Sequence, residues 1–131
     1  MKKIIGICLA FALIFSVLVI PASAADSAYQ KGNVGNYDYS CQLINRRNAN
    51  LAWTYIFFSG TQSYAPQYAS VSMTATFMYE DGSTTSRSGN ASNNNGSAYT
   101  TVARPSGSTE HTARSTHVAI SKTINLSCSW M

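Results

Sequence analysis

The clearest pattern in the chain is a strict alternation of apolar and polar residues that begins at Tyr68. Apolar side chains occupy the odd positions of residues 69–79, and Ser or Thr occupies the even positions of residues 70–76. A period of two places alternate side chains on opposite faces of a strand, so the pattern predicts a half-buried strand over residues 68–79. The Asp-Gly pair that follows favours a tight hairpin turn, and it predicts a return strand over residues 84–88. Because this strand is entirely polar, it is expected either to lie at a sheet edge or to be short.

Two further strands are predicted before this one. Residues 50–58 are apolar at both parities towards their end, which favours a strand covered on both faces there. Residues 37–45 form its predicted partner, and residues 46–50 make a polar connection between the two. One face of the partner strand carries Tyr39, Cys41 and Leu43. By parity, the aromatic residues assigned to the core are Trp53, Phe57, Phe77 and Trp130.

Alternation returns over residues 118–130, where apolar residues take the even positions and Lys122 interrupts them. Either two strands meet there, or one long strand bends at a bulge. A short strand is predicted over residues 99–103. Loops are predicted over residues 59–67, 89–97 and 105–108. The loop over residues 89–97 is expected to be the most mobile, because it has no apolar residue larger than Ala.

These elements predict an all-β chain. About seven short strands with polar turns, and no segment of helical period, favour a small antiparallel β-sandwich, with a small β-barrel as the alternative. Cys41 and Cys128 lie on the apolar faces of the first and last of these predicted strands, so a disulfide between them is predicted for an exported chain. The loop that it would close corresponds to a stabilisation of roughly 4–5 kcal/mol. Two buried thiols, or a catalytic thiol, remain the alternatives.

Residues 1–24 have the parts of a secretory signal peptide: two lysines, an apolar run over residues 4–20, and an Ala-Ser-Ala cleavage site. Cleavage after Ala24 leaves one secreted β domain over residues 25–131. The alternative is an uncleaved anchor, but seventeen residues barely span a hydrocarbon layer of ~30 Å. We therefore expect an extracellular protein, of Gram-positive bacterial type, that contacts the membrane through the leader before cleavage.

Charge and motifs argue against several functions. The net charge of +4 is small and scattered, so nucleic acid is not an expected partner. Two His and three Cys residues predict no metal site and no cofactor. No G-x-S-x-G motif is present. His111 and His117 are interpreted as polar strand positions near an edge, and the chain is expected not to be an enzyme. A hydrolase would need one of these histidines within hydrogen-bond reach of Ser, Cys128 or an acid.

The tyrosines are the feature that suggests binding. Tyrosines near strand ends and loops, with neighbouring Asn and Ser, can stack on sugar rings while amides bond hydroxyls, although Tyr is also a favourable strand residue. One basic pair accompanies them. The candidate ligand contacts are Tyr64, Tyr68, Tyr99, Arg46 and Arg47. The partners expected for such a surface are a cell-wall glycan, an envelope component or another surface protein.

Residues 111–118, with the sequence HTARSTHV, resemble the His/Thr/Ser stretch of lactococcin-972-like bacteriocins. The resemblance implies a secreted β-sandwich that acts at the cell envelope, and it assigns no role to any residue. Our first expectation is a secreted, non-enzymatic binding or interaction module that acts at the cell surface or in the medium. A bacteriocin-like antimicrobial protein is the alternative, and a small secreted hydrolase is the second alternative.

Overall fold

The computed structural model describes residues 27–129, which form eight strands. The predicted signal peptide and Trp130 lie outside the described residues. The strands are β1 (Ser27–Val34), β2 (Tyr37–Arg46), β3 (Ala49–Phe58), β4 (Ala69–Tyr79), β5 (Thr84–Asn93), β6 (Ser97–Ala103), β7 (Ser108–Ala119) and β8 (Lys122–Ser129). Residues 27–129 include no helix long and apolar enough to cross a membrane.

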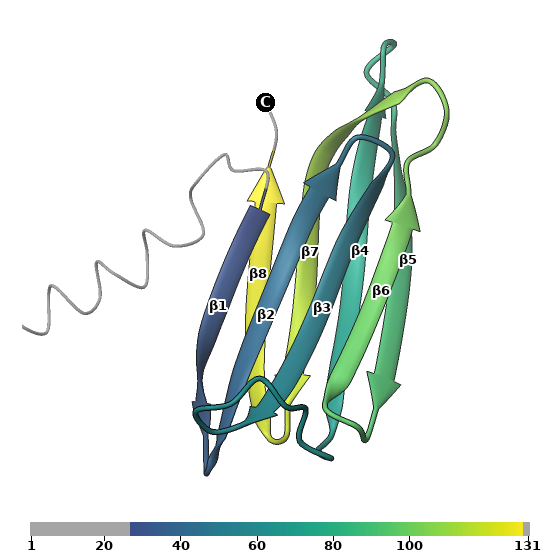
Figure 1. Ribbon diagram of the computed structural model, residues 1–131. Coiled ribbons are helices and arrows are strands. Elements are labelled where there is room, and N and C mark those ends of the chain that lie inside the picture. The colour runs from purple at the N-terminus through teal and green to yellow at the C-terminus, as the bar shows by residue number, and fades with distance from the viewer. Residues whose placement is uncertain (1–26, 130–131) are drawn as a thin grey trace, which may run out of the picture.

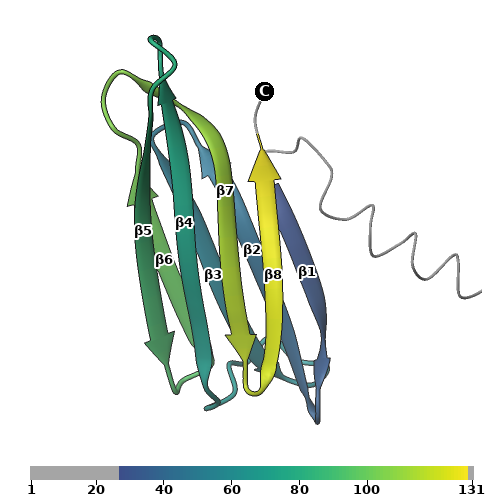
Figure 2. The same ribbon diagram turned by 180° about the vertical axis from the view of Figure 1, so that it is seen from behind.

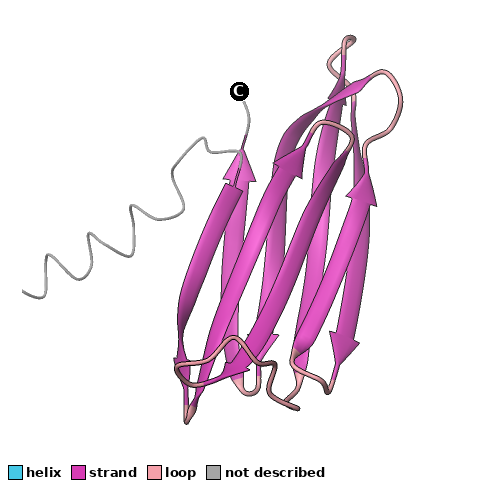
Figure 3. Ribbon diagram, in the orientation of Figure 1, coloured by secondary structure: helices cyan, strands magenta, loops and turns pink. Residues whose placement is uncertain are grey.

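The strands form two antiparallel sheets that pack face to face, as Figures 1 and 2 show from opposite sides. The first sheet has the order β1-β2-β3-β6 and the second has the order β5-β4-β7-β8. Short turns and loops join the strands at the two ends of the layers (Figure 3). The apolar core lies between the inner faces and includes Leu43, Ile56, Met73, Phe77 and Leu126. The predicted all-β class is confirmed, and the two separate sheets are those of a sandwich rather than of a closed barrel.

Most of the predicted strands are present, with small changes in their ends. The alternating segment is β4, whose odd residues are buried from Ala69 to Phe77. The C-terminal stretch resolves as two strands, because β7 and β8 meet in a turn at Ile120 and Ser121. Ile120 adopts a left-handed conformation there, with φ of 60°. Lys122 thus begins a new strand rather than a bulge.

The predicted mobile loop over residues 89–97 is wrong. Residues 89–93 complete β5 and Ser97 begins β6, so residues 94–96 alone connect the two strands. Apolar content is a poor guide here because β5 is an edge strand whose outward side chains face water, while its backbone pairs with β4. Gly89 faces inward opposite Met73, and a Cβ at this position would lie 2.6 Å from Thr100 Oγ1. The absence of a side chain therefore lets β6 approach closely.

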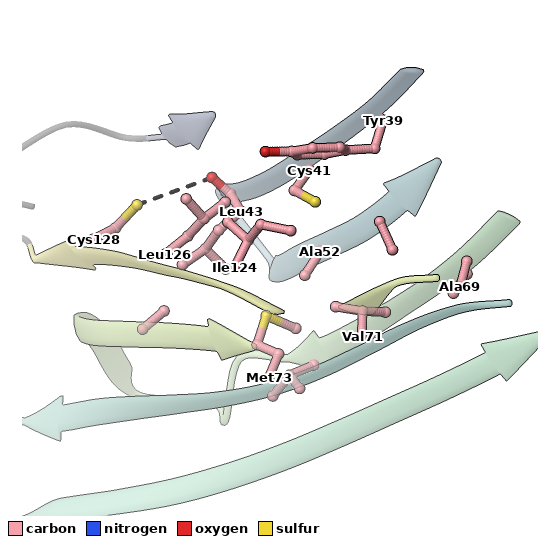
Figure 4. Packing of buried hydrophobic residues seen from close by; sticks show 14 of the residues in the cluster. Tyr39, Cys41, Leu43, Ala52, Ala69, Val71, Met73, Ile124, Leu126 and Cys128 are labelled. Carbon is pink, nitrogen blue, oxygen red and sulfur yellow. Dashed lines mark hydrogen bonds between the residues drawn. The ribbon is translucent and has the colours of Figure 1, made fainter. Parts of the chain in front are cut away.

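The structure does not contain the predicted disulfide between Cys41 and Cys128. Both side chains are buried in the core, as their parity predicted, but their sulfur atoms are not at bonding distance. Cys128 Sγ instead lies 3.9 Å from the carbonyl oxygen of Leu43, two residues further along β2 (Figure 4). Parity fixes the layer into which a side chain points, whereas the offset between the two sheets sets its partner.

The assignment of Trp53 and Phe57 to the core is also wrong. The hairpin between β2 and β3 pairs Leu43 with Ala52, and Tyr39 with Ile56. Because paired residues share a face, the inward side chains of β2 bring the even residues of β3 inward. The odd residues, Trp53 and Phe57 among them, then point out of the sandwich and are only partly buried. Phe77 is fully buried, as predicted.

The two outer faces of the sandwich differ in chemistry. The outer face of the β5-β4-β7-β8 sheet is built almost entirely of Ser, Thr and Asn, with Met78, Arg114 and Val118 as exceptions. Hydroxyls and amides pair across its strands, as between Thr74 and Ser88 at 2.9 Å. The outer face of the β1-β2-β3-β6 sheet carries most of the exposed aromatic side chains. This second face holds the candidate functional site.

Candidate binding groove

Strand register arranges the outer face of the β1-β2-β3-β6 sheet into three ranks that cross the strands. The first rank consists of Tyr29, Gln42, Trp53 and Tyr99. The second consists of Lys31, Ser40, Tyr55 and Ser97. The third consists of Asn33, Asp38 and Phe57, with Tyr64 paired to Phe57 through an isolated bridge. Long side chains of β1 thus face the aromatic residues of β3 across the shorter side chains of β2.

The aromatic side chains of this face touch one another in a continuous series. Trp53 and Tyr55 stack with ring centroids 5.8 Å apart, and Tyr55 meets Phe57 edge-on at 6.2 Å. Tyr64 stacks on Phe57 at 5.2 Å and meets Tyr55 edge-on at 5.5 Å. Partial burial, and the neighbouring phenols of Tyr64 and Tyr99, raise the pKa of Tyr55. These contacts fix the rings of Trp53, Tyr55, Phe57 and Tyr64, which we call the aromatic wall.

The connection between β3 and β4 places Tyr64 in the wall. It runs across the end of the β1-β2-β3-β6 sheet (Figure 1) and folds back on β3, where the Ala65 amide donates to the Ile56 carbonyl at 2.9 Å. The carboxylate of Asp38 binds the first residues of this β3–β4 connection. It accepts hydrogen bonds from the Gly60 amide at 2.9 Å, the Ser59 hydroxyl at 3.2 Å and the Asn33 side chain. Asp38 therefore anchors the segment that carries Tyr64.

The space between β1 and the aromatic wall is an open groove of ≈ 630 Å³. Tyr29 and Lys31 line one side, and Tyr55, Phe57 and Tyr64 line the other, while Ser40 lies between them. Thr61 and Gln62 of the β3–β4 connection contribute further polar groups. The volume lies within the usual range for sites that take a small ligand or a short segment of a chain. Aromatic rings, neutral donors and acceptors, and the charged side chains of Lys31 and Asp38 therefore converge on one hollow.

The structure brings two of the five predicted ligand contacts to this face and leaves three elsewhere. Tyr64 is part of the wall and is 50% exposed, and Tyr99 lies beside Trp53 and is 47% exposed. Tyr68 precedes β4, where its carbonyl accepts the Ile120 amide. Arg46 and Arg47 lie at the β2–β3 hairpin, at the opposite end of the sheet from the Tyr64 connection (Figure 1).

Several groove residues escaped the sequence interpretation. The sequence pattern assigns Trp53 and Phe57 to the core. It groups Tyr29 with the tyrosines near strand ends and loops without selecting it as a ligand contact, and it gives Lys31 no role. Both residues belong to β1, a strand that the pattern does not predict. The register of the β2–β3 hairpin was the missing signal. A two-residue turn at Arg47 and Asn48 pairs the inward Leu43 with Ala52, which turns the odd residues of β3 outward.

A second cluster of polar groups lies inside the sandwich. His117, read from the sequence as an edge position, is 0% exposed. Its Nδ1 is 2.8 Å from Thr54 Oγ1, and its Nε2 is 2.7 Å from Ser115 Oγ. Burial lowers the pKa of His117 to about 4, against a smaller opposite effect of the Trp53 carbonyl. The histidine does reach a serine, as the hydrolase alternative requires, but substrate would meet the pair only if the two sheets separated.

Cys41 lies near this cluster, and burial raises the pKa of its thiol to about 12, against a smaller opposite effect of a hydrogen bond with Thr54. The thiolate is the nucleophilic form of cysteine, so Cys41 is poorly suited to react at neutral pH. Within residues 27–129, no three His, Cys, Asp or Glu side chains gather as a metal site.

The chain matches none of the protein-family models, curated proteins or solved structures with which it was compared.

Proposed function

We propose that the chain is a secreted, non-enzymatic module that binds a glycan of the cell envelope in the groove beside the aromatic wall. The observation that carries this proposal is the wall itself, a set of mutually packed Trp, Tyr and Phe side chains on a face open to solvent. Grouped aromatic residues of this kind, rimmed by polar groups, mark binding surfaces in soluble proteins.

The opposite face of the molecule supports a binding role for these rings. The β5-β4-β7-β8 sheet covers its outer face with Ser, Thr and Asn. The sandwich therefore tolerates a polar outer face, and packing of the core does not require aromatic rings on the other one. Folding of the sandwich therefore does not explain why these apolar rings are exposed, whereas a ligand that covers them would remove their apolar surface from water.

A sugar chain fits the chemistry of the groove better than a protein surface does. A pyranose ring has an apolar side of C–H bonds, which packs against the negative face of an aromatic ring, and a rim of hydroxyl groups. Tyr29 and Tyr64 supply ring surface on the two sides of the groove, while Ser40 and Gln62 supply donors and acceptors for hydroxyls. A stable protein interface would instead need a broad, well-packed patch around an apolar centre.

The test is sedimentation of the exported protein with purified, protein-free cell walls of a Gram-positive bacterium. We expect saturable binding that is about tenfold weaker for Tyr64→Ala, the scale of a single aromatic hot spot. Tyr68→Ala removes a tyrosine of similar exposure outside the groove, and it should bind like the original protein. Equal affinity of all three proteins, or equal loss in both variants, would remove the groove as the binding site.

A further inference from the structure

The groove contains two charged side chains, Lys31 and Asp38, and neither forms an ion pair within the described residues. Lys31 is exposed on β1, lines the groove and also lines a smaller adjacent hollow of ≈ 380 Å³. Within residues 27–129 the one ion pair joins Arg104 to Glu110, so Lys31 forms none there. Its ammonium group carries three hydrogen-bond donors, and apart from Asp38 the other residues that line the groove are uncharged.

The other charged group of the groove, Asp38, is already engaged by the protein. Register places Asp38 opposite Asn33, and Lys31 opposite Ser40, so the two charges lie in neighbouring ranks. Both carboxylate oxygens accept hydrogen bonds, from the Asn33 side chain, the Ser59 hydroxyl and the Gly60 amide. These donors occupy acceptor positions on both carboxylate oxygens, although the carboxylate keeps its negative charge. Lys31 has no comparable set of acceptors.

From this asymmetry we infer that the ligand is an anionic glycan, a polyhydroxylated chain whose carboxylate or phosphodiester groups pair with Lys31. The inference rests on the proposed function, because it assigns the charge of the ligand that the aromatic wall would bind. The sugar rings pack against Tyr29 and Tyr64, and the acidic group lies at the β1 side of the groove beside the ammonium. A charge-assisted hydrogen bond beside the rings would favour an acidic sugar chain over a neutral one, which hydrogen bonds to neutral hydroxyls alone would not do.

The test compares three soluble polymers by calorimetry at low salt: polygalacturonate, which carries carboxylates, polyglycerol phosphate, which carries phosphodiesters, and neutral dextran. We expect at least one anionic polymer to bind roughly tenfold more tightly than dextran. High salt should reduce this preference, because an exposed ion pair is screened. The anionic polymer that binds more tightly identifies the source of the charge, and either result supports the inference.

Two lysine variants separate the role of Lys31 from general attraction by a basic protein. Lys31→Met keeps a long apolar stem but removes the charge, and it should bind the anionic polymers as weakly as dextran. Lys122→Met removes the same charge from β8, where the ammonium lies 5.3 Å from the centre of the Tyr39 ring, and it should keep the preference.

The outcomes also distinguish the inference from the proposed function. Equal binding of neutral and anionic polymers by the original protein, or an unchanged preference in Lys31→Met, overturns the inference while glycan binding stands. Absence of binding to every polymer and to cell walls overturns both.

Discussion

His117 is held between the two sheets by two hydroxyl groups, and their hydrogen bonds assign its protonation. Thr54 Oγ1 donates to the Ser70 carbonyl at 2.8 Å, so toward His117 it acts as an acceptor. Nδ1 therefore carries the proton, and Nε2 accepts a hydrogen bond from the Ser115 hydroxyl. Both nitrogens of the neutral ring are satisfied, whereas a charged ring would have no carboxylate among these partners.

This arrangement predicts a loss of stability in mild acid. The pKa of His117 is about 4 in the folded protein against 6.5 for an ordinary histidine, so below pH 6.5 the unfolded chain binds a proton that the folded protein excludes. The stabilisation is complete above pH 6.5 and falls by up to roughly 3 kcal/mol as the pH drops to about 4. Urea unfolding measured across this range should show the loss.

The matched variant for this prediction is His117→Gln, which keeps hydrogen-bonding groups but does not titrate. Its free energy of unfolding is expected to be lower than that of the original protein at neutral pH, yet nearly constant between pH 6.5 and pH 4.5. If the original protein and the variant lost stability with the same slope over this interval, the buried neutral histidine would not be its cause.

At the scale of elements, prediction from the sequence succeeded where one face of a strand is polar and failed where both faces carry apolar groups. β4 alternates cleanly, and its inward and outward residues follow the sequence pattern. In β3 the even residues Asn50, Ala52 and Thr54 are small or polar and only Ile56 is a large apolar residue before Phe58, while the odd residues Trp53, Tyr55 and Phe57 are aromatic. Size favoured the odd face for the core, but pairing with β2 placed the even face there.

The same physical limit explains the other misses. Alternate residues of β1 are partly buried. Hydropathy did not reveal this strand, because its sequence SAYQKGNV is mostly polar. Nor did it reveal the second half of β5, which is held by pairing with β4. The pairing register of neighbouring strands decides which residues of β1 and β5 belong to a strand, and this register depends on contacts between segments that are distant in the sequence. Phe57 and Lys31 could be placed in one groove only once that register was known.

Gly89 provides a test of how closely the two sheets approach at β5. A side chain here would meet Thr100 Oγ1 at 2.6 Å and the Thr101 carbonyl at 3.2 Å, so Gly89→Val should destabilise the protein by about 1–3 kcal/mol through overpacking. The control is Asn90→Val on the exposed face of the same strand, with an expected change within about 0.5 kcal/mol. Similar urea midpoints for both variants would show that β5 does not pack as described.

At the scale of the whole molecule, the inner faces and the two outer faces of the sandwich differ in their chemistry. The inner faces form an apolar core with a buried polar cluster around His117. One outer face is a regular array of hydroxyls and amides, and the other holds the aromatic wall and the groove. Two β-sheets back to back thus form a support for the groove, whose floor and two sides come from β1, β2, β3 and the β3–β4 connection.

The most direct test of this account is a map of amide chemical shifts as cell-wall glycan fragments are added to the isotopically labelled protein. The account predicts perturbed resonances around the groove, including Tyr29, Lys31, Tyr55 and Tyr64, with little change on the outer face of the β5-β4-β7-β8 sheet. Perturbations confined to that hydroxyl-rich face, or to the Arg46–Arg47 hairpin, would contradict it.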